Sequence, residues 1–148
     1  MGSRHKGTEV EINALNTFIK LMRAAESAAV KINGSLPKNG LTESQFGLLD
    51  VLYHLGPLCQ KDLGNKLLKT GGNITLVVDN LEKQNFVRRE RGIKDRRFIK
   101  VHLTVEGKKL FEKVFPIQVK IIVNSMNALS DKEQLQLQKL CKKIGIQN

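Results

Sequence analysis

Basic side chains are concentrated in one short segment of this 148-residue chain. The chain carries 25 Lys and Arg against 14 Asp and Glu, which gives a formal net charge of +11 at pH 7. Residues 87–109 contain nine basic and three acidic residues, so this segment contributes +6 of that charge. Such an excess is typical of a protein that binds a polyanion, with nucleic acid as the first candidate and an anionic membrane surface as the second.

The residue types that catalysis and metal binding require form no recognisable pattern in this sequence. It contains no Walker loop, no G-x-S-x-G and no G-x-G-x-x-G. His5, His54 and His102 lack ligand spacing to one another, to cysteines or to carboxylates. We therefore expect a protein that is not an enzyme and that holds no metal and no cofactor.

Length, hydropathy and cysteine usage indicate a single folded domain in a reducing compartment. Hydrophobic residues make up 41% of the chain and charged residues 26%, as in ordinary globular proteins. No run approaches the ~18 apolar residues that span a bilayer, and no apolar segment of a secretory signal follows the N-terminus. Since Cys59 and Cys141 lie far apart, we expect no disulfide scaffold and predict a cytoplasmic protein.

Helical signals come first in the chain. Apolar residues recur at helical spacing over residues 8–33, and a loop follows them. Thr42 and Gln45 have the spacing of a capping box, in which each residue bonds the other's backbone. A second helix should therefore start there, and Gly56 with Pro57 should end it.

A helix-turn-helix is predicted next. A brief helix over about residues 60–68 comes after a short extended piece at 58–59, and the chain then turns tightly at 70–73. Another helix runs to about residue 84, where Asn85 suits its end because asparagine tolerates the left-handed conformation of a helix cap. DNA-binding proteins use this arrangement to present the second helix to the major groove.

The basic segment lies in a predicted β-hairpin. Residues 86–91 and 98–103 are rich in strand formers, and the polar residues 92–97 form the loop between them. A hairpin with a charged tip directly after the second helix is a wing. Thr104 then caps a long helical region, and the S-x-x-E pattern from Ser130 opens a last helix.

Three stretches carry the most specific pattern of the chain. They are LTESQFGLLDVLYHLGP (41–57), QKDLGNKLLKTGGNITLVVDNLEKQNFVRRE (60–90) and KDRRFIKVHLTVEGKKL (94–110). In this order and spacing the sequence resembles the MarR (multiple antibiotic resistance regulator) family of winged helix-turn-helix transcription factors. The expected fold class is mainly α (α+β), a winged helix-turn-helix with a two-stranded β-wing and N- and C-terminal helices that form a dimerisation region.

The resemblance implies a function as well as a fold. Residues 1–148 would form a single MarR-type domain, with dimerisation helices at about 8–40 and 104–148 and a DNA-binding part at about 41–103. The homodimer would bind a pseudo-palindromic operator in double-stranded DNA. Members of the family commonly repress genes and release DNA when a small phenolic or aromatic compound binds, while others respond to cysteine oxidation.

Candidate DNA contacts lie on the second helix and in the hairpin loop. By the resemblance, Arg96 or Arg97 enters the minor groove while Asp95 braces the loop, and narrow minor grooves attract arginine. Asn73 could pair with adenine, whereas Thr70 could either contact DNA or cap the helix. The expected contacts, with those on phosphate included, are Lys61, Lys69, Thr70, Gly71, Asn73, Leu76, Asn80, Arg88, Arg89, Lys94, Asp95, Arg96 and Arg97.

Two residues depart from the family pattern. Many members carry Arg directly after the Thr of the recognition helix, but here Leu76 follows Thr75. Leucine cannot form a bidentate contact with guanine but can pack on a thymine methyl group, so the operator is expected to be richer in A·T there. Asn85 stands where relatives usually have Gly, a change that the cap geometry allows.

The means of regulation stays open at this point. Leu15, Ile19, Phe46 and His54 are candidate effector-binding residues and are equally plausible as core. Cys59, close to Lys61, is the candidate redox residue, although two buried and inert thiols are the favoured interpretation. The alternative function is a non-specific, architectural nucleic-acid-binding protein, which would bind all DNA equally and with a steep salt dependence.

Overall fold

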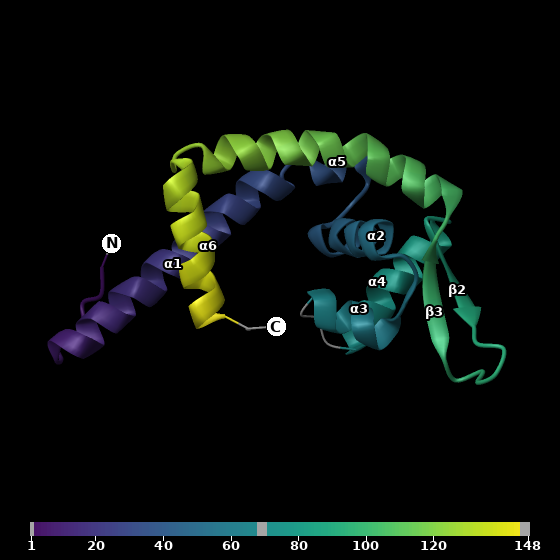
Figure 1. The fold of residues 1–148 in the computed structure, drawn as a ribbon, viewed down its shortest axis with the longest axis horizontal. Coiled ribbons are helices and arrows are strands. Elements are labelled where there is room, and N and C mark those ends of the chain that lie inside the picture. Colours follow the sequence, from purple (N-terminus) through teal and green to yellow (C-terminus); the bar gives the residue numbers. More distant parts are fainter. Residues whose placement is uncertain (1, 68–70, 146–148) are drawn as a thin grey trace. The chain divides into compact units, whose positions relative to one another are not determined.

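The computed structural model describes residues 2–67 and 71–145, which form helices and one small antiparallel sheet (Figure 1). They fall into two compact units, residues 35–118 and a second unit of residues 1–34 with 119–148. The elements are α1 (Glu9–Asn33), the 3-10 helix η1 (Leu36–Asn39), α2 (Glu43–Leu55), β1 (Leu58–Cys59), α3 (Gln60–Leu67), α4 (Gly71–Lys83), β2 (Val87–Arg91), β3 (Ile99–Leu103), α5 (Val105–Met126) and α6 (Asp131–Ile144).

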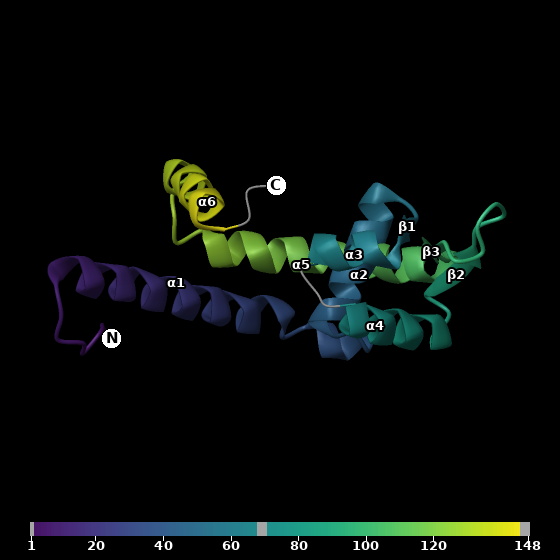
Figure 2. The same ribbon diagram turned by 90° about the horizontal axis from the view of Figure 1, so that it is seen from below.

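The unit of residues 35–118 contains the predicted helix-turn-helix and wing. The tight turn predicted at 70–73 is wrong for residues 71–73, which already belong to α4, and residue 70 lies outside the described residues. Strands β2 and β3 form the predicted hairpin, with Val87 paired to Leu103. Strand β1 pairs antiparallel with β3, Leu58 opposite Val101, so the short extended piece joins the hairpin as a third strand in the order β1–β3–β2. The loop of the hairpin projects away from α2, α3 and α4 (Figure 2).

One hydrophobic core holds this unit together. Phe111 of α5 is fully buried and stacks on Phe46 and Phe115, with ring centroids 5.5 and 4.9 Å apart. Burial of each such side chain stabilises the fold by about 1.5–3 kcal/mol. The other buried hydrophobic residues are Leu36, Leu41, Leu48, Leu49, Leu52, Leu63, Ile74, Val78, Leu81, Val87, Val101 and Val114.

Side-chain caps set several helix starts. The capping box predicted at Thr42 is confirmed: its hydroxyl accepts from the Gln45 N–H at 3.2 Å, and its own N–H donates to Gln45 Oε1 at 3.0 Å. Ser130 forms the second predicted capping box, at the start of α6. Thr8 forms a further one at the start of α1, which confirms the predicted extent of that helix.

The junction between α4 and the wing is fixed by backbone geometry. Asn85 adopts φ +60°, which confirms the left-handed stop predicted for it, and the Phe86 N–H donates to Leu81 O at 2.9 Å. The Thr104 hydroxyl donates to Asn85 O at 2.7 Å. Gly107 has no room for a Cβ because the Phe86 carbonyl lies against it. The two ends of the hairpin are therefore tied to the end of α4.

The other unit differs because its helices bury little. No described residue of α1 or α6 is buried. The apolar residues Leu135, Leu137, Leu140 and Ile144 of α6 are all exposed in the single chain. None of the helices in the described ranges is long and apolar enough to cross a membrane.

Candidate nucleic-acid interface

Helix α4 has a buried face and an outward face. Ile74, Val78 and Leu81 are at most 1% exposed and hold the helix in the core. At 3.6 residues per turn, the opposite side of the helix carries Asn73, Leu76, Asn80 and Lys83. Leu76 is 59% exposed, so its side chain is available to a partner.

The outward face of α4 borders a groove. The groove has a volume of about 370 Å³ and separates α4 from the first turn of α2. Amide, hydroxyl and apolar groups line it together, from Thr42, Ser44, Gln45, Asn73, Leu76, Val77 and Asn80. Such a mixture suits base edges, which present hydrogen-bonding groups beside thymine methyl groups.

The wing loop is closed by its own hydrogen bonds. The Gly92 N–H donates to Phe98 O at 2.7 Å, and a Cβ on Gly92 would lie 2.6 Å from Asp95 O, so the turn requires glycine. Asp95 accepts from the Arg97 backbone N–H at 2.9 Å and from the Arg97 guanidinium at 3.2 and 3.3 Å. The hydrogen bonds from the Arg97 guanidinium are the main reason that the pKa of Asp95 is held below its ordinary value, and the bond from the Arg97 backbone N–H adds to this effect.

The two adjacent arginines of the loop have different surroundings. Arg97 pairs with Asp95, yet its side chain is 92% exposed. Arg96 is exposed and takes part in no ion pair with the described residues. Lys94 is exposed in the same loop. The tip of the wing therefore carries three cations and one braced carboxylate.

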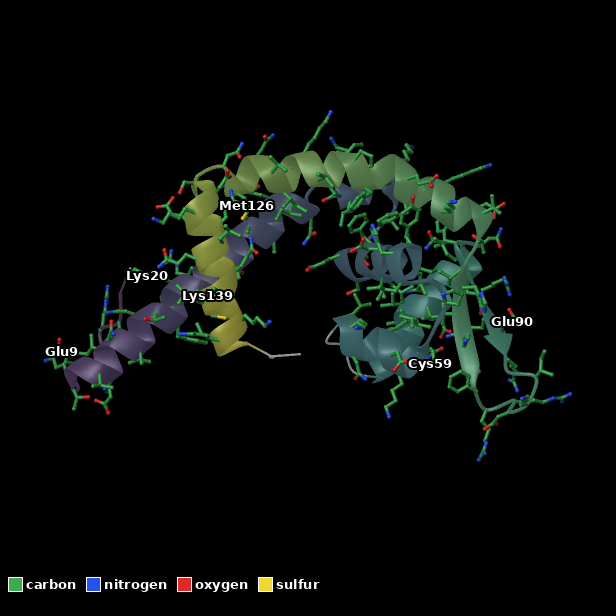
Figure 3. All side chains as sticks on the ribbon, in the orientation of Figure 1. Glu9, Lys20, Cys59, Glu90, Met126 and Lys139 are labelled. Carbon is green, nitrogen blue, oxygen red and sulfur yellow. The ribbon has the colours of Figure 1, made fainter. Side chains whose placement is uncertain are left out.

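Arg88 and Glu90 form an ion pair on the exposed side of β2. The Arg88 Nη1 lies 2.8 Å from Glu90 Oε2, and His102 Nε2 approaches the same oxygen at 3.1 Å from β3. The hydrogen bond from Arg88 is the main reason that the pKa of Glu90 is lowered. Glu90 is labelled on the hairpin in Figure 3. Arg88 is thus exposed but already has a counter-ion.

Arg89 has an arrangement that the sequence did not predict. Its side chain is only 20% exposed, and its guanidinium lies 2.6 Å from Asp79 and 3.0 Å from Glu82. A phosphate contact was expected for Arg89, but its cation faces two carboxylates of α4. Thr75, Asp79 and Glu82, at spacings of four and three residues, are the sequence signal that could have indicated this contact.

Two of the remaining expected DNA contacts lie at the starts of helices. Lys61 is exposed in the first turn of α3, and Gly71 begins α4. Lys69 and Thr70 lie outside the residues that the structure describes.

The four effector candidates are divided between the two units. Phe46 and His54 belong to an aromatic cluster in the unit of residues 35–118, where the His54 ring lies edge-on to Phe115 at 5.4 Å. Leu15 and Ile19 lie on α1 in the other unit. Tyr53 belongs to the aromatic cluster too, and its hydroxyl donates to Glu112 at 3.0 Å, which raises the pKa of Tyr53. No pattern in the sequence had indicated Tyr53.

The structure contradicts the favoured interpretation of the cysteines as two buried thiols. Cys141 is exposed, because no described residue covers this part of α6, and Cys59 is half-buried. The Cys59 thiol donates to Asp62 Oδ2 at 3.1 Å. Among the described residues, no group of three or more His, Cys, Asp or Glu could hold a metal ion.

A helix-turn-helix followed by an antiparallel hairpin with a cationic loop defines the winged helix-turn-helix class of DNA-binding proteins. The sequence model of the MarR family matches residues 41–99, from just before α2 to the first residue of β3. The HTH-type transcriptional regulator YkoM of Bacillus subtilis is 36% identical over 138 residues, which cover 93% of this chain and 89% of YkoM. The chain belongs to the MarR family of DNA-binding transcriptional regulators, and these are not enzymes.

Solved structures share this fold. Sco3205 of Streptomyces coelicolor, a MarR family regulator solved in complex with DNA, has a TM-score of 0.84 at 21% identity over 97% of this chain and 91% of its own. BpsR of Bordetella bronchiseptica, whose DNA binding is regulated by 6-hydroxynicotinic acid, has a TM-score of 0.79 at 23% identity over 86% of this chain and 97% of its own. The likeness confirms the predicted winged helix-turn-helix.

Proposed function

We propose that this regulator is a homodimeric, sequence-specific repressor that binds a pseudo-palindromic operator and is released by a small aromatic ligand. The observation that carries the DNA-binding part is the outward face of α4 beside a wing whose loop holds three exposed cations. Sco3205, which has the same fold, was solved with DNA. A recognition helix in the major groove and arginines in the minor groove read sequence and shape together.

The proposed contacts divide by chemistry. Base edges are read by Asn73, Leu76 and Asn80, with Gly71 close to the DNA backbone, and Asn73 pairs with adenine. The wing loop places Arg96 or Arg97 in the minor groove. Contacts to phosphate supply affinity and register rather than discrimination. The residues assigned to phosphate are Lys61, Lys69, Arg88 and Lys94, whereas Thr70 either contacts DNA or caps the recognition helix.

The dimer is proposed from the apolar surface of the terminal helices. Monomeric proteins rarely expose large contiguous apolar surface, and such surface marks an interaction site. In the unit of residues 1–34 and 119–148, the exposed large hydrophobic residues are Val10, Leu15, Phe18, Met22, Val30, Val119, Ile122, Val123, Leu135, Leu137, Leu140 and Ile144. A second copy of the chain covers this surface in our proposal, with residues 8–40 and 104–148 as dimerisation helices and 41–103 as the DNA-binding part of one MarR-type domain.

The effector is proposed from the aromatic cluster. Phe46, Tyr53, His54 and Phe115 surround the fully buried Phe111 and offer aromatic rings and two polar groups, a combination that suits a phenol or an aromatic acid. The DNA binding of BpsR is regulated by 6-hydroxynicotinic acid, an aromatic acid. An effector releases DNA only if it binds one arrangement of the two recognition helices better than the other. Oxidation of Cys59 is less favoured, since its thiol is half-buried and already donates a hydrogen bond to Asp62.

Selection of duplexes from a random-sequence library tests the proposed function. The wild-type chain should enrich two inverted half-sites whose centres lie about one helical turn, ~34–36 Å, apart. Enrichment without any consensus, or of a single unrepeated half-site, contradicts a dimeric specific regulator.

Sedimentation of a paired variant tests the dimer. Phe18→Glu with Leu140→Glu puts charges on the exposed faces of α1 and α6 and should give a folded monomer with weak operator binding. Leu55→Glu, a comparably exposed apolar position on α2 in the DNA-binding part, is the matched control and should remain dimeric. A dimeric Phe18→Glu/Leu140→Glu variant refutes the proposed interface.

A further inference from the structure

The Arg89 side chain connects strand β2, in which it lies, to helices α3 and α4. Its Nη2 lies 2.6 Å from Asp79 Oδ1, its Nη1 donates to Glu82 Oε1 at 3.0 Å, and its Nε donates to Gln60 Oε1 at 2.9 Å. Its backbone N–H also donates to Glu82 Oε2 at 2.8 Å. The first two partners lie on α4, the third is the first residue of α3, and Arg89 itself is in β2. A single guanidinium therefore joins the wing to both helices of the helix-turn-helix.

Helix α4 offers Arg89 a face of its own. Thr75, Asp79 and Glu82 lie four and three residues apart, so they share one side of the helix over two turns. At 100° per residue this side lies between the buried face and the outward face. Gln60 closes the network, because its Nε2 donates to Thr75 Oγ1 at 3.2 Å while its Oε1 accepts from Arg89. Contacts along two turns fix both the rotation and the tilt of a helix.

The chemistry around Arg89 does not suit a DNA phosphate. Side chains alternate along a strand, and Arg89 lies on the same side of β2 as the buried Val87, whereas Arg88 points to the exposed side. Two carboxylates already compensate the one guanidinium charge. A phosphate brought to this cluster would meet a net negative charge.

We propose that Arg89 is a positioning residue for sequence recognition. It holds α4 at a fixed rotation to the wing, so that Asn73, Leu76 and the wing arginines meet their grooves in one register. Base-edge hydrogen bonds lose strength steeply with distance and angle, whereas attraction to phosphates does not depend on such alignment. Loss of the Arg89 network therefore lowers affinity for the operator and spares affinity for other DNA. This inference rests on the proposed specific binding of DNA.

Arg89→Lys separates positioning from phosphate contact. Lysine keeps the charge but cannot reproduce the forked contacts with Asp79, Glu82 and Gln60. With the duplex enriched by wild type, this variant should bind at least about tenfold more weakly. A scrambled duplex of equal length should be bound within about twofold of wild type, with an unchanged salt dependence. Arg91→Lys, at an exposed arginine of the same strand that is none of the proposed contacts, is the matched control and should keep the wild-type ratio between the two duplexes.

Asp79→Asn supplies an independent test that leaves Arg89 in place. Removal of a carboxylate raises general attraction to DNA, so a merely electrostatic role predicts tighter binding to both duplexes. Positioning predicts weaker binding to the enriched duplex and equal or tighter binding to the scrambled one. Thermal unfolding of both variants shows that they are folded at the assay temperature, and Asp79→Asn carries the test should Arg89→Lys fail to fold.

Three results would overturn the proposal. Arg89→Lys at wild-type affinity for the enriched duplex shows that the network is dispensable. If Arg89→Lys loses the same affinity for both duplexes, and Arg89→Met, which removes the charge, has a salt slope reduced by about 1, then Arg89 contacts a phosphate instead. A wild-type chain that enriches no consensus overturns the proposed function, and this inference with it.

Discussion

Because the two wing arginines have different surroundings, replacing each of them by alanine should weaken operator binding to a different extent. Arg97 is paired with Asp95, whereas Arg96 takes part in no ion pair with the described residues. Arg96→Ala removes one unpaired cation. Arg97→Ala removes a cation, releases the brace of the loop and leaves the Asp95 carboxylate unpaired beside the DNA. Arg97→Ala should therefore weaken operator binding more than Arg96→Ala does.

The size of the effect follows from the arginine–DNA interactions that each variant removes. Removal of one direct arginine contact costs about 1–3 kcal/mol, or roughly 5–150-fold in affinity. Removal of one cation from the interface reduces the slope of log affinity against log salt by about 0.9. Arg96→Ala should show about these values. The double variant Arg96→Ala/Arg97→Ala loses two such contacts. It should bind the operator at least about 30-fold more weakly, which corresponds to twice the lower cost of about 1 kcal/mol, and its salt slope should fall by about 2.

Fluorescence anisotropy with a labelled operator duplex measures both the affinity and its salt slope. The titrations are run between about 50 and 200 mM salt, a range over which contacts to phosphate change the affinity strongly. Lys113→Ala is the matched control, because Lys113 is an exposed cation on α5, which supplies none of the proposed contacts. Circular dichroism and sedimentation show that the double variant is a folded dimer. Unchanged operator affinity in that folded variant would refute the assignment of the wing to DNA.

Three further predictions concern single residues. Leu76→Arg should shift the preferred base at one position of each half-site from A·T to guanine, seen by repeated library selection; an unchanged consensus contradicts a base contact by this residue. Asn85→Gly should leave stability to urea nearly unchanged, whereas Asn85→Ala should lower it by roughly 1 kcal/mol because alanine disfavours positive φ; equal stability of the two variants contradicts the strained cap. Since hydrogen bonds from Arg97 lower the pKa of Asp95, the contribution of this pair to stability is complete above the ordinary pKa of about 3.9 and is lost as the pH falls through the lower folded value. Arg97→Ala should raise that pKa toward its ordinary value in a carboxyl-carbon NMR titration, and no change would contradict the pairing.

The local elements were predictable because their signals are local. The capping boxes at Thr42 and Ser130, the left-handed Asn85 and the Asp95–Arg97 brace each depend on residues within a few positions. For the same reason the order of helix, turn, helix and hairpin could be predicted from punctuation and periodicity.

The interactions that depend on distant residues were not predictable. Nothing near Arg89 in the sequence shows that Gln60, 29 positions earlier, accepts from its Nε. Strand β1 is two residues long, and only its pairing with Val101 makes it part of the sheet. Cys141 and the leucines of α6 have the spacing of a core, but no described residue of the same chain buries them. Apolar periodicity shows that a face must be covered and not what covers it.

The central claim is that the regulator reads DNA sequence rather than charge alone. The most direct measurement is the dissociation constant of the wild-type chain for its enriched duplex and for a scrambled duplex of equal length and composition, at one near-physiological salt concentration. A ratio of at least about 10³ between the two is predicted for a specific regulator. Equal affinities, both falling steeply with salt, would contradict the claim and identify a non-specific DNA-binding protein.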